Sequence, residues 1–212
     1  MIYFISDLHG EKSEALEAYL KIATEKDLLI ILGDVGLNFY DTLENMEFTR
    51  YFMSLDKKIA FLDGNHENFD YLKTFRCKEW NGGEVGRLTK NIVYLKRGNI
   101  YTLEGKTFFV FGGCKSSSKW KENGLWYPEE EPSDEEINLA YKNLDKYNYK
   151  VDYICTHNYD YKKKNVSVKL MELTDFIDKN VEFKKWYSGH WHQNFELDNK
   201  HRVVYDKLIC IE

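Results

Sequence analysis

Side chains that can bind a metal or move a proton recur in this chain directly after short apolar runs. The clearest example is the sequence DGNHE at 63–67, which follows the apolar run 59–62. An asparagine after a glycine can also simply turn the chain and cap the next helix, because Asn favours N-caps and Gly favours turns. Four other stretches share the same design, and we therefore interpret these residues as a site for chemistry.

Together the five stretches contain most of the histidines of the chain. The residues that follow the apolar runs are Asp7 and His9, then Asp34, then Asn65 with His66, then His157, and finally His190 and His192. Among the six histidines of the chain, only His201 lies elsewhere. In an extended segment residues i and i+2 point to the same side, so the paired ligands of the first and last stretches can converge.

The donor set combines imidazoles, carboxylates and one amide, without a thiolate. Such ligands suit borderline to hard divalent metals, and their number is sufficient for two ions. We expect two divalent cations, with manganese ahead of iron, zinc, nickel and cobalt.

The hydrophobic pattern predicts the elements that must position these side chains. We expect strands at 2–5, 28–32, 59–62, 92–95, 99–103, 107–111, 151–155 and 183–187, with closing strands at 193–197 and 201–211. We expect helices at 12–25, 42–56, 66–75, 133–148 and 167–179, and a loop around 81–83. The strand and helix order of the N-terminal part predicts parallel pairing, and ligands gather at the carboxyl ends of such strands.

Length and composition limit the classes of protein that fit. With 212 residues, 43% of them hydrophobic and 31% charged, the chain should form one domain, 1–212. No apolar stretch approaches the roughly 20 residues of a membrane span. The first residues lack the features of a signal peptide, so we expect a cytoplasmic protein. The net charge of −5 argues against broad affinity for nucleic acids or anionic membranes.

Taken in order, the motifs Asp-x-His, Gly-Asp, Gly-Asn-His-Glu, a lone His and Gly-His-x-His resemble the calcineurin-like metallophosphoesterase family. The resemblance implies an α/β fold, with a two-sheet β-sandwich core flanked by helices in four layers. It also implies a role for each motif residue. One metal would be held by Asp7, His9 and His192, the other by Asn65, His157 and His190, with Asp34 bridging both and His66 as the catalytic histidine near the phosphate.

Such a site is suited to phosphoester hydrolysis. Two metal ions can act as Lewis acids on a phosphoryl group, and a water bridging them ionises near neutrality. The bridging hydroxide would then attack phosphorus in line with the leaving oxygen. As an imidazolium with an unperturbed pKa of about 6.5, His66 would protonate the leaving group or stabilise charge on the phosphoryl oxygens.

The chain departs from the protein Ser/Thr phosphatase branch of the family. That branch has the motif Gly-Asp-x-x-Asp-Arg-Gly, whereas this chain has GDVGLNF at 33–39. The branch also has an arginine directly before Gly-Asn-His-Glu, whereas this chain has Asp63 there. These differences weigh against phosphoprotein phosphatase activity and leave phosphomonoesterase and phosphodiesterase activity open. Asp63 and Asp41 are candidates for orienting His66, by their proximity in sequence.

Two further segments have alternative interpretations. The irregular insertion at about 114–132 contains lysines and tryptophans, and it is either a substrate-facing rim or a surface loop anchored by its aromatic residues. The triple lysine at 162–164 is more typical of a solvated loop than of a phosphate site.

We expect the partner to be a phosphorylated small molecule, a nucleotide or a phosphoprotein, with no membrane and no extended nucleic acid. Two alternatives to a small-substrate esterase are a nuclease of the same family and a non-catalytic scaffold on the same fold.

Overall fold

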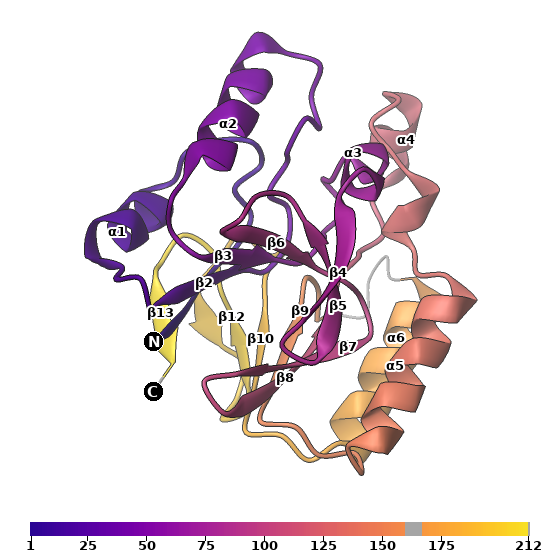
Figure 1. Ribbon diagram of the computed structural model, residues 1–212. Coiled ribbons are helices and arrows are strands. Elements are labelled where there is room, and N and C mark those ends of the chain that lie inside the picture. Colours follow the sequence, from indigo (N-terminus) through magenta and orange to yellow (C-terminus); the bar gives the residue numbers. More distant parts are fainter. Residues whose placement is uncertain (160–166, 212) are drawn as a thin grey trace.

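Two mixed β-sheets pack face to face, and helices cover the outer face of each sheet (Figure 1). The computed structural model describes residues 1–159 and 167–211, so the triple lysine at 162–164 lies outside the described residues. The order of layers is helix, sheet, sheet, helix. This arrangement confirms the α/β fold with a two-sheet core flanked by helices.

The first sheet has seven strands in the order β13-β1-β2-β3-β6-β5-β4. Strands β1, β2, β3 and β6 pair in parallel, as the N-terminal pattern predicts. The strands are β1 (Ile2–Ile5), β2 (Leu28–Ile31), β3 (Ile59–Phe61), β4 (Arg76–Trp80), β5 (Gly83–Arg87), β6 (Ile92–Leu95) and β13 (Ile209–Ile211).

The second sheet has six strands in the order β11-β12-β10-β9-β8-β7. Here β8, β9, β10 and β12 are parallel, and β7 and β11 are antiparallel strands at the edges. The strands are β7 (Asn99–Leu103), β8 (Lys106–Phe111), β9 (Tyr153–Thr156), β10 (Lys185–Ser188), β11 (Phe195–Glu196) and β12 (His201–Val203).

The helices begin where capping residues satisfy the first free N–H groups. Ser13, Thr42 and Ser133 cap α1, α2 and α5, and Ser133 forms a capping box with Glu136. The helices are α1 (Glu14–Ile22), α2 (Leu43–Ser54), α3 (Phe69–Lys73), α4 (Ser118–Glu122), the 3₁₀ helix η1 (Pro128–Glu130), α5 (Asp134–Lys146) and α6 (Val168–Asn180).

Alternation along the strands builds a separate apolar layer on each face of each sheet. In β1, Ile2 and Phe4 point between the sheets, and Tyr3 and Ile5 point toward α1 and α2. In β8 of the second sheet, Phe108 and Val110 point between the sheets, and Phe109 and Phe111 point toward α5 and α6. Strands covered on both faces need continuous apolar runs, which explains why the sequence shows them without polar alternation.

The structure adds two strands to the prediction for residues 76–87. The loop predicted around 81–83 is the turn at Asn81 and Gly82, but β4 and β5 on either side of it, which form an antiparallel hairpin, are not predicted. The reason is that β4 is an edge strand whose residues are mostly exposed, so it lacks the apolar signal of the other strands.

Other elements also differ from the prediction. The helix expected at 66–75 is only the five-residue α3, because Asn68 caps it and the residues before it belong to the loop after β3. The closing strand expected at 201–211 is two strands, and β12 and β13 lie in different sheets. The insertion expected to be irregular contains the short helices α4 and η1.

The parallel strands of both sheets direct their carboxyl ends to one region. The loop after β9 reaches the first sheet, where His157 Nδ1 lies 2.8 Å from the Leu32 carbonyl oxygen after β2. The loop after β10 also reaches the first sheet, because the backbone N–H of His190 donates a hydrogen bond to Asp7 Oδ2 at 2.9 Å. The five predicted stretches therefore meet where the two sheets come together. Within the described residues, no helix has the length and apolar character needed to cross a membrane.

Candidate metal centre

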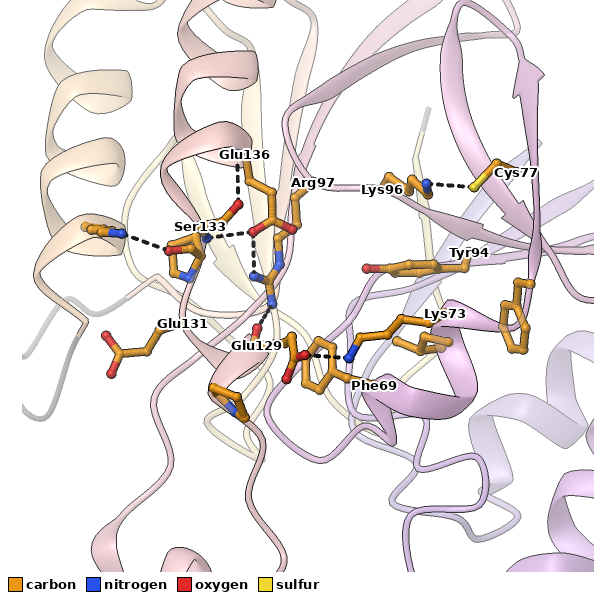
Figure 2. A pocket seen from close by; sticks show the side chains of 15 residues that line it. Phe69, Lys73, Cys77, Tyr94, Lys96, Arg97, Glu129, Glu131, Ser133 and Glu136 are labelled. Carbon is orange, nitrogen blue, oxygen red and sulfur yellow. Dashed lines mark hydrogen bonds and ion pairs between the residues drawn. The ribbon is translucent and has the colours of Figure 1, made fainter.

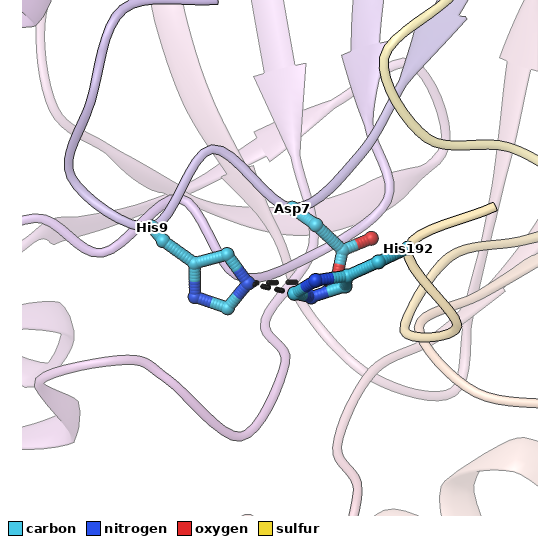
Figure 3. Close-up of side chains that lie close together, drawn as sticks. All are labelled: Asp7, His9 and His192. Atoms are coloured by element: carbon cyan, nitrogen blue, oxygen red, sulfur yellow. Dashed lines mark hydrogen bonds and ion pairs between the residues drawn. The ribbon is translucent and has the colours of Figure 1, made fainter.

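Asp7, His9 and His192 converge from the loops after β1 and β10 (Figure 3). The Nε2 atoms of His9 and His192 lie 2.9 Å apart. Asp7 Oδ1 lies 3.4 Å from His192 Nε2 and 3.9 Å from His9 Nε2. This carboxylate oxygen is buried and has no hydrogen-bond partner in the structure. One carboxylate and two imidazoles therefore face a common point, as ligands of a shared cation would.

A second group forms around Asp34 at the end of β2. Ligand atoms of Asp34, His157 and His190 lie within 4.8 Å of one another, and so do those of His9, Asp34 and His66. His157 Nε2 is 3.4 Å from Asp34 Oδ2 and 3.3 Å from Asn65 Oδ1. Asp34 thus lies between both groups of imidazoles, and every predicted site residue is in this region.

The arrangement around His157 fits a bound cation. When His157 is neutral and donates its Nδ1 proton to the Leu32 carbonyl, its Nε2 is an acceptor. This nitrogen then faces the oxygens of Asp34 and Asn65, so three acceptors meet without a donor between them. A divalent metal satisfies all three, and the backbone carbonyl fixes the imidazole in the required tautomer.

The backbone is strained at most of the predicted ligands. Asp7, His9, Asp34, His190 and His192 all have φ between 48° and 69°, in the left-handed region. Residues with a Cβ rarely adopt this conformation, and strain of this kind clusters at functional sites. The surrounding fold therefore holds these side chains in place at a cost in free energy.

Two glycines allow the loops to approach one another. A Cβ on Gly64 would lie 2.1 Å from Asp34 Oδ1, and one on Gly189 would lie 1.9 Å from Ser6 Oγ and 2.8 Å from Asp7 Oδ2. The glycines of the Gly-Asn-His-Glu and Gly-His-x-His motifs are thus required by the close packing of the two central carboxylates.

Burial and the central carboxylates set the charge of the imidazoles. Burial lowers the pKa of His157, but the Asp34 carboxylate outweighs this effect and raises that pKa to about 10. Burial and the nearby His157 lower the pKa of His190 to about 4. The nearby Asp7 carboxylate raises the pKa of His192. Without a cation, a proton on His157 compensates the Asp34 charge, and a metal would take over this role.

His66 lies among aromatic rings next to the two groups. Its ring centroid is 4.3 Å from that of Trp120, 4.9 Å from that of His9 and 5.2 Å from that of Phe39. Its Nδ1 is buried without a hydrogen-bond partner in the structure. Burial lowers the pKa of His66, which corrects the expectation of an unperturbed imidazolium. The neutral ring still has one N–H to donate.

Asp63 does not orient His66, contrary to one of the two expectations. Its carboxylate accepts hydrogen bonds from the Tyr94 hydroxyl at 2.8 Å and from Arg97 Nε at 2.9 Å. Arg97 is itself buried, and its guanidinium also pairs with Glu136 of α5 at 3.3 Å. This ion pair fixes the start of the Gly-Asn-His-Glu loop against the second sheet.

Beside this ion pair is a pocket of about 680 Å³ (Figure 2). Figure 2 shows Lys73 next to Glu129 and Arg97 next to Glu136 around it. None of the predicted site residues lines this pocket. It is therefore a separate cavity from the metal centre.

Removing the buried guanidinium should strongly destabilise the fold. Arg97→Met leaves the fully buried Asp63 carboxylate without its charge partner, and we expect a loss of about 3–5 kcal/mol in the free energy of unfolding. Urea denaturation measures this loss. Arg76→Met changes an exposed arginine and should shift stability by less than about 0.5 kcal/mol. Equal stabilities for the two variants would contradict a structural role for the ion pair.

Several residues of the centre were not predicted from the sequence. The Glu67 carboxylate is fully buried and accepts from the Val35 N–H at 2.8 Å, which joins the loop after β3 to the loop after β2. Ser116 Oγ accepts from Asn65 Nδ2 at 3.1 Å. Cys114 Sγ lies 3.5 Å from His190 Nε2. Cys114 and Ser116 follow β8, which is parallel to β9. The residues after Phe111 therefore reach the same edge of the sheet as His157, and the apolar run that forms β8 was the signal for this in the sequence.

Glu130 anchors the segment that contains Ser116. Its carboxylate is buried and accepts from the Ser116 N–H at 2.9 Å. Burial raises the pKa of Glu130 from 4.5 to about 7, although the hydrogen bonds from Ser116 act in the opposite direction.

The stability of the protein should therefore depend on pH through Glu130. Because the folded pKa exceeds the unfolded one, the native state keeps a proton that the unfolded state has lost, and stability falls as pH rises from near 5 to near 8. The shift corresponds to about 2–3 kcal/mol over this range. Glu130→Gln has no such proton to lose. When metal-stripped proteins are denatured at a series of pH values, the free energy of unfolding of the variant should therefore rise relative to that of the wild type as the pH rises. A difference that stays constant with pH would contradict this account.

The comparison with protein families agrees with the motif order. The family model described as calcineurin-like phosphoesterase matches residues 1–194. Among curated proteins, no sequence matches the chain significantly. One similar solved structure is a protein of unknown function from Aquifex aeolicus, with 18% identity, a TM-score of 0.41, and coverage of 86% of this chain and 87% of the other.

Proposed function

The chain belongs to the calcineurin-like phosphoesterase family, and from this premise we propose that it is a phosphoester hydrolase with a dinuclear metal centre. One observation supports this proposal above the others. His157 Nε2, Asp34 Oδ2 and Asn65 Oδ1 converge in a buried place, where either a proton on His157 or a cation must lie between them. A bound cation would satisfy all three atoms at once, and a second group of ligands lies next to them.

The residues divide into two ligand sets around one shared carboxylate. We assign Asp7, His9 and His192 to one cation, and Asn65, His157 and His190 to the other. Asp34 would serve both, because it lies within reach of imidazoles from each set. Nitrogen and oxygen donors of this kind support manganese as the native metal, with iron, zinc, nickel and cobalt as alternatives.

When bound, two such cations would act as Lewis acids on the phosphoryl oxygens and would lower the pKa of a water between them. The protein contributes the orientation of this site. The backbone N–H of His66 donates a hydrogen bond to Asp34 Oδ1 at 2.7 Å, and the buried His66 ring lies at the edge of the same region. His66 would donate its ring proton to the leaving oxygen or to a phosphoryl oxygen.

The structure also supports a small substrate over a phosphoprotein. Arg97, which lies beside the Gly-Asn-His-Glu loop in the structure, is buried against Asp63 and does not face the metal centre. Both monoesters and diesters therefore belong to the proposed substrate class, including nucleotides. We propose the cytoplasm as the place of action, which agrees with four cysteines that form no disulfide in the described residues.

The test is hydrolysis of p-nitrophenyl phosphate and bis-p-nitrophenyl phosphate by metal-stripped protein, with Mn²⁺, Ni²⁺, Co²⁺, Zn²⁺ and Mg²⁺ added back one at a time. We expect no activity without metal and restoration by at least one ion. Preference for the first compound would identify a phosphomonoesterase, and preference for the second a phosphodiesterase. Absence of hydrolysis with every metal, on these and a wider panel of phosphoesters, would contradict the proposal and favour a non-catalytic scaffold.

A further inference from the structure

The segment 114–131, which we call the strap, begins at the carboxyl end of β8 and passes over the metal centre. Its helix α4 has no buried residue. One of its side chains nevertheless contacts the centre, because the Trp120 ring meets the His66 ring edge to face at 4.3 Å, with an interplanar angle of 86°. Trp120 is only partly buried, so the indole also faces solvent.

The strap is attached to the centre at both ends of this helix. Before α4, the Gly113 N–H donates to the Asp63 carbonyl at 3.0 Å, and Ser116 Oγ accepts from Asn65. After α4, the buried Glu130 binds the Ser116 N–H and so closes the strap. These contacts place the segment before α4 next to Asn65, and the Trp120 ring of α4 lies against the His66 ring.

Packing does not account for the tryptophan at this position. A structural tryptophan is expected to fill an apolar layer, but Trp120 belongs to none of the three core clusters. No other aromatic ring of the described residues stacks on its face. The indole therefore presents an open aromatic surface next to the histidine that we place at the leaving group.

The charges next to Trp120 fit an anionic ligand. The strap as a whole contains three lysines and four glutamates, but α4 presents Lys119 and Lys121 to solvent on either side of Trp120. Lys121 Nζ lies 4.3 Å from the ring centroid of Trp126. A ligand with a planar ring and a phosphate group could stack its ring on Trp120 and place its phosphate near Lys119 or Lys121.

We propose that Trp120 is a specificity-determining residue that stacks on a nucleobase, so that the preferred substrates are phosphoesters of nucleosides. The inference rests on the proposed function, since it names the substrate class of the same centre. Stacking between a base and an aromatic side chain contributes about 1–3 kcal/mol. Such a contact raises kcat/KM for a substrate with a base by about 5- to 150-fold.

Paired substrates that differ only in the base test this role. For monoesters the pair is adenosine 5′-monophosphate and ribose 5-phosphate, which have the same leaving oxygen. For diesters it is thymidine 5′-(p-nitrophenyl phosphate) and the 5-(p-nitrophenyl phosphate) of 1,2-dideoxyribose, which keeps the sugar and lacks the base. The ratio of kcat/KM within a pair is measured in the ester class that the wild type hydrolyses, for the wild type, Trp120→Phe, Trp120→Leu and Trp126→Leu.

We expect the wild type to prefer the substrate with a base by about 10-fold or more, and Trp120→Leu to lose this preference mainly through KM. Trp120→Phe should retain most of it, and Trp126→Leu, a change in the same strap, should leave the ratio unchanged. An equal loss on both substrates in Trp120→Leu would show a structural role, and a wild type without base preference would overturn the inference while leaving the phosphoesterase intact. A wild type inactive on every ester would remove both proposals.

Discussion

Replacing Asp34 with alanine will abolish hydrolysis and release the bound metal. Asp34 is fully buried and lies between the two groups of ligands, with Oδ2 3.8 Å from His9 Nε2 and 3.4 Å from His157 Nε2. Among the described residues it is the carboxylate that both groups share, so its loss leaves imidazoles facing one another. Since the proposed mechanism takes its catalytic charge from the cations, we expect kcat/KM to fall by about 10³-fold or more.

Metal content separates this result from simple unfolding. Metal-stripped wild type and Asp34→Ala are dialysed against Mn²⁺, and bound metal is measured together with the circular dichroism spectrum. We expect two ions per wild-type chain and fewer than one in the folded variant. Asp70→Ala, which removes an exposed carboxylate on α3, should retain both metal and activity. Full metal occupancy or normal turnover in Asp34→Ala would contradict the shared-ligand role.

Replacing His66 with alanine should leave both metals bound and remove most of the turnover. The His66 ring is outside the two assigned ligand sets, although it lies near His9 and Asp34. Proton donation by a positioned side chain contributes about 10²- to 10⁴-fold. We therefore expect a loss of this size with an alkyl phosphoester, whose leaving oxygen needs a proton.

The dependence on the leaving group identifies the role of His66. p-Nitrophenolate leaves without a proton, so His66→Ala should lose much less activity on p-nitrophenyl esters than on alkyl esters. The comparison uses the ester class that the wild type hydrolyses, and metal content is measured in parallel. Full activity of the variant on a poor leaving group would refute the assignment, and loss of metal would show that His66 is a ligand.

The positions of the site residues could be predicted from the sequence because one physical rule governs them. Continuous apolar runs such as 28–32 indicate strands buried on both faces, and parallel strands bring their carboxyl ends together. Asp34 and His157 follow such runs and lie 3.4 Å apart in the structure. The glycines of the motifs also follow from this packing, since Gly64 has no room for a Cβ beside Asp34.

The surroundings of the site could not be predicted in this way, because they depend on contacts between distant residues. Asp63 appeared to be free to orient His66, yet it pairs with Arg97, 34 residues further along the chain. Trp120 and His66 come together through a strap with weak hydrophobic periodicity. The hairpin of β4 and β5 was missed because an exposed edge strand has little apolar pattern. Burial of His66, which lowers its pKa, is likewise a property of the assembled fold.

The most direct test of the two-metal centre is a crystal structure of the protein grown with Mn²⁺, with anomalous diffraction recorded near the manganese absorption edge. We predict two anomalous peaks, one at Asp7, His9 and His192 and one at Asn65, His157 and His190, with the Asp34 carboxylate between them. A single peak, peaks outside these two sets, or no peak at a saturating concentration of metal would contradict the account.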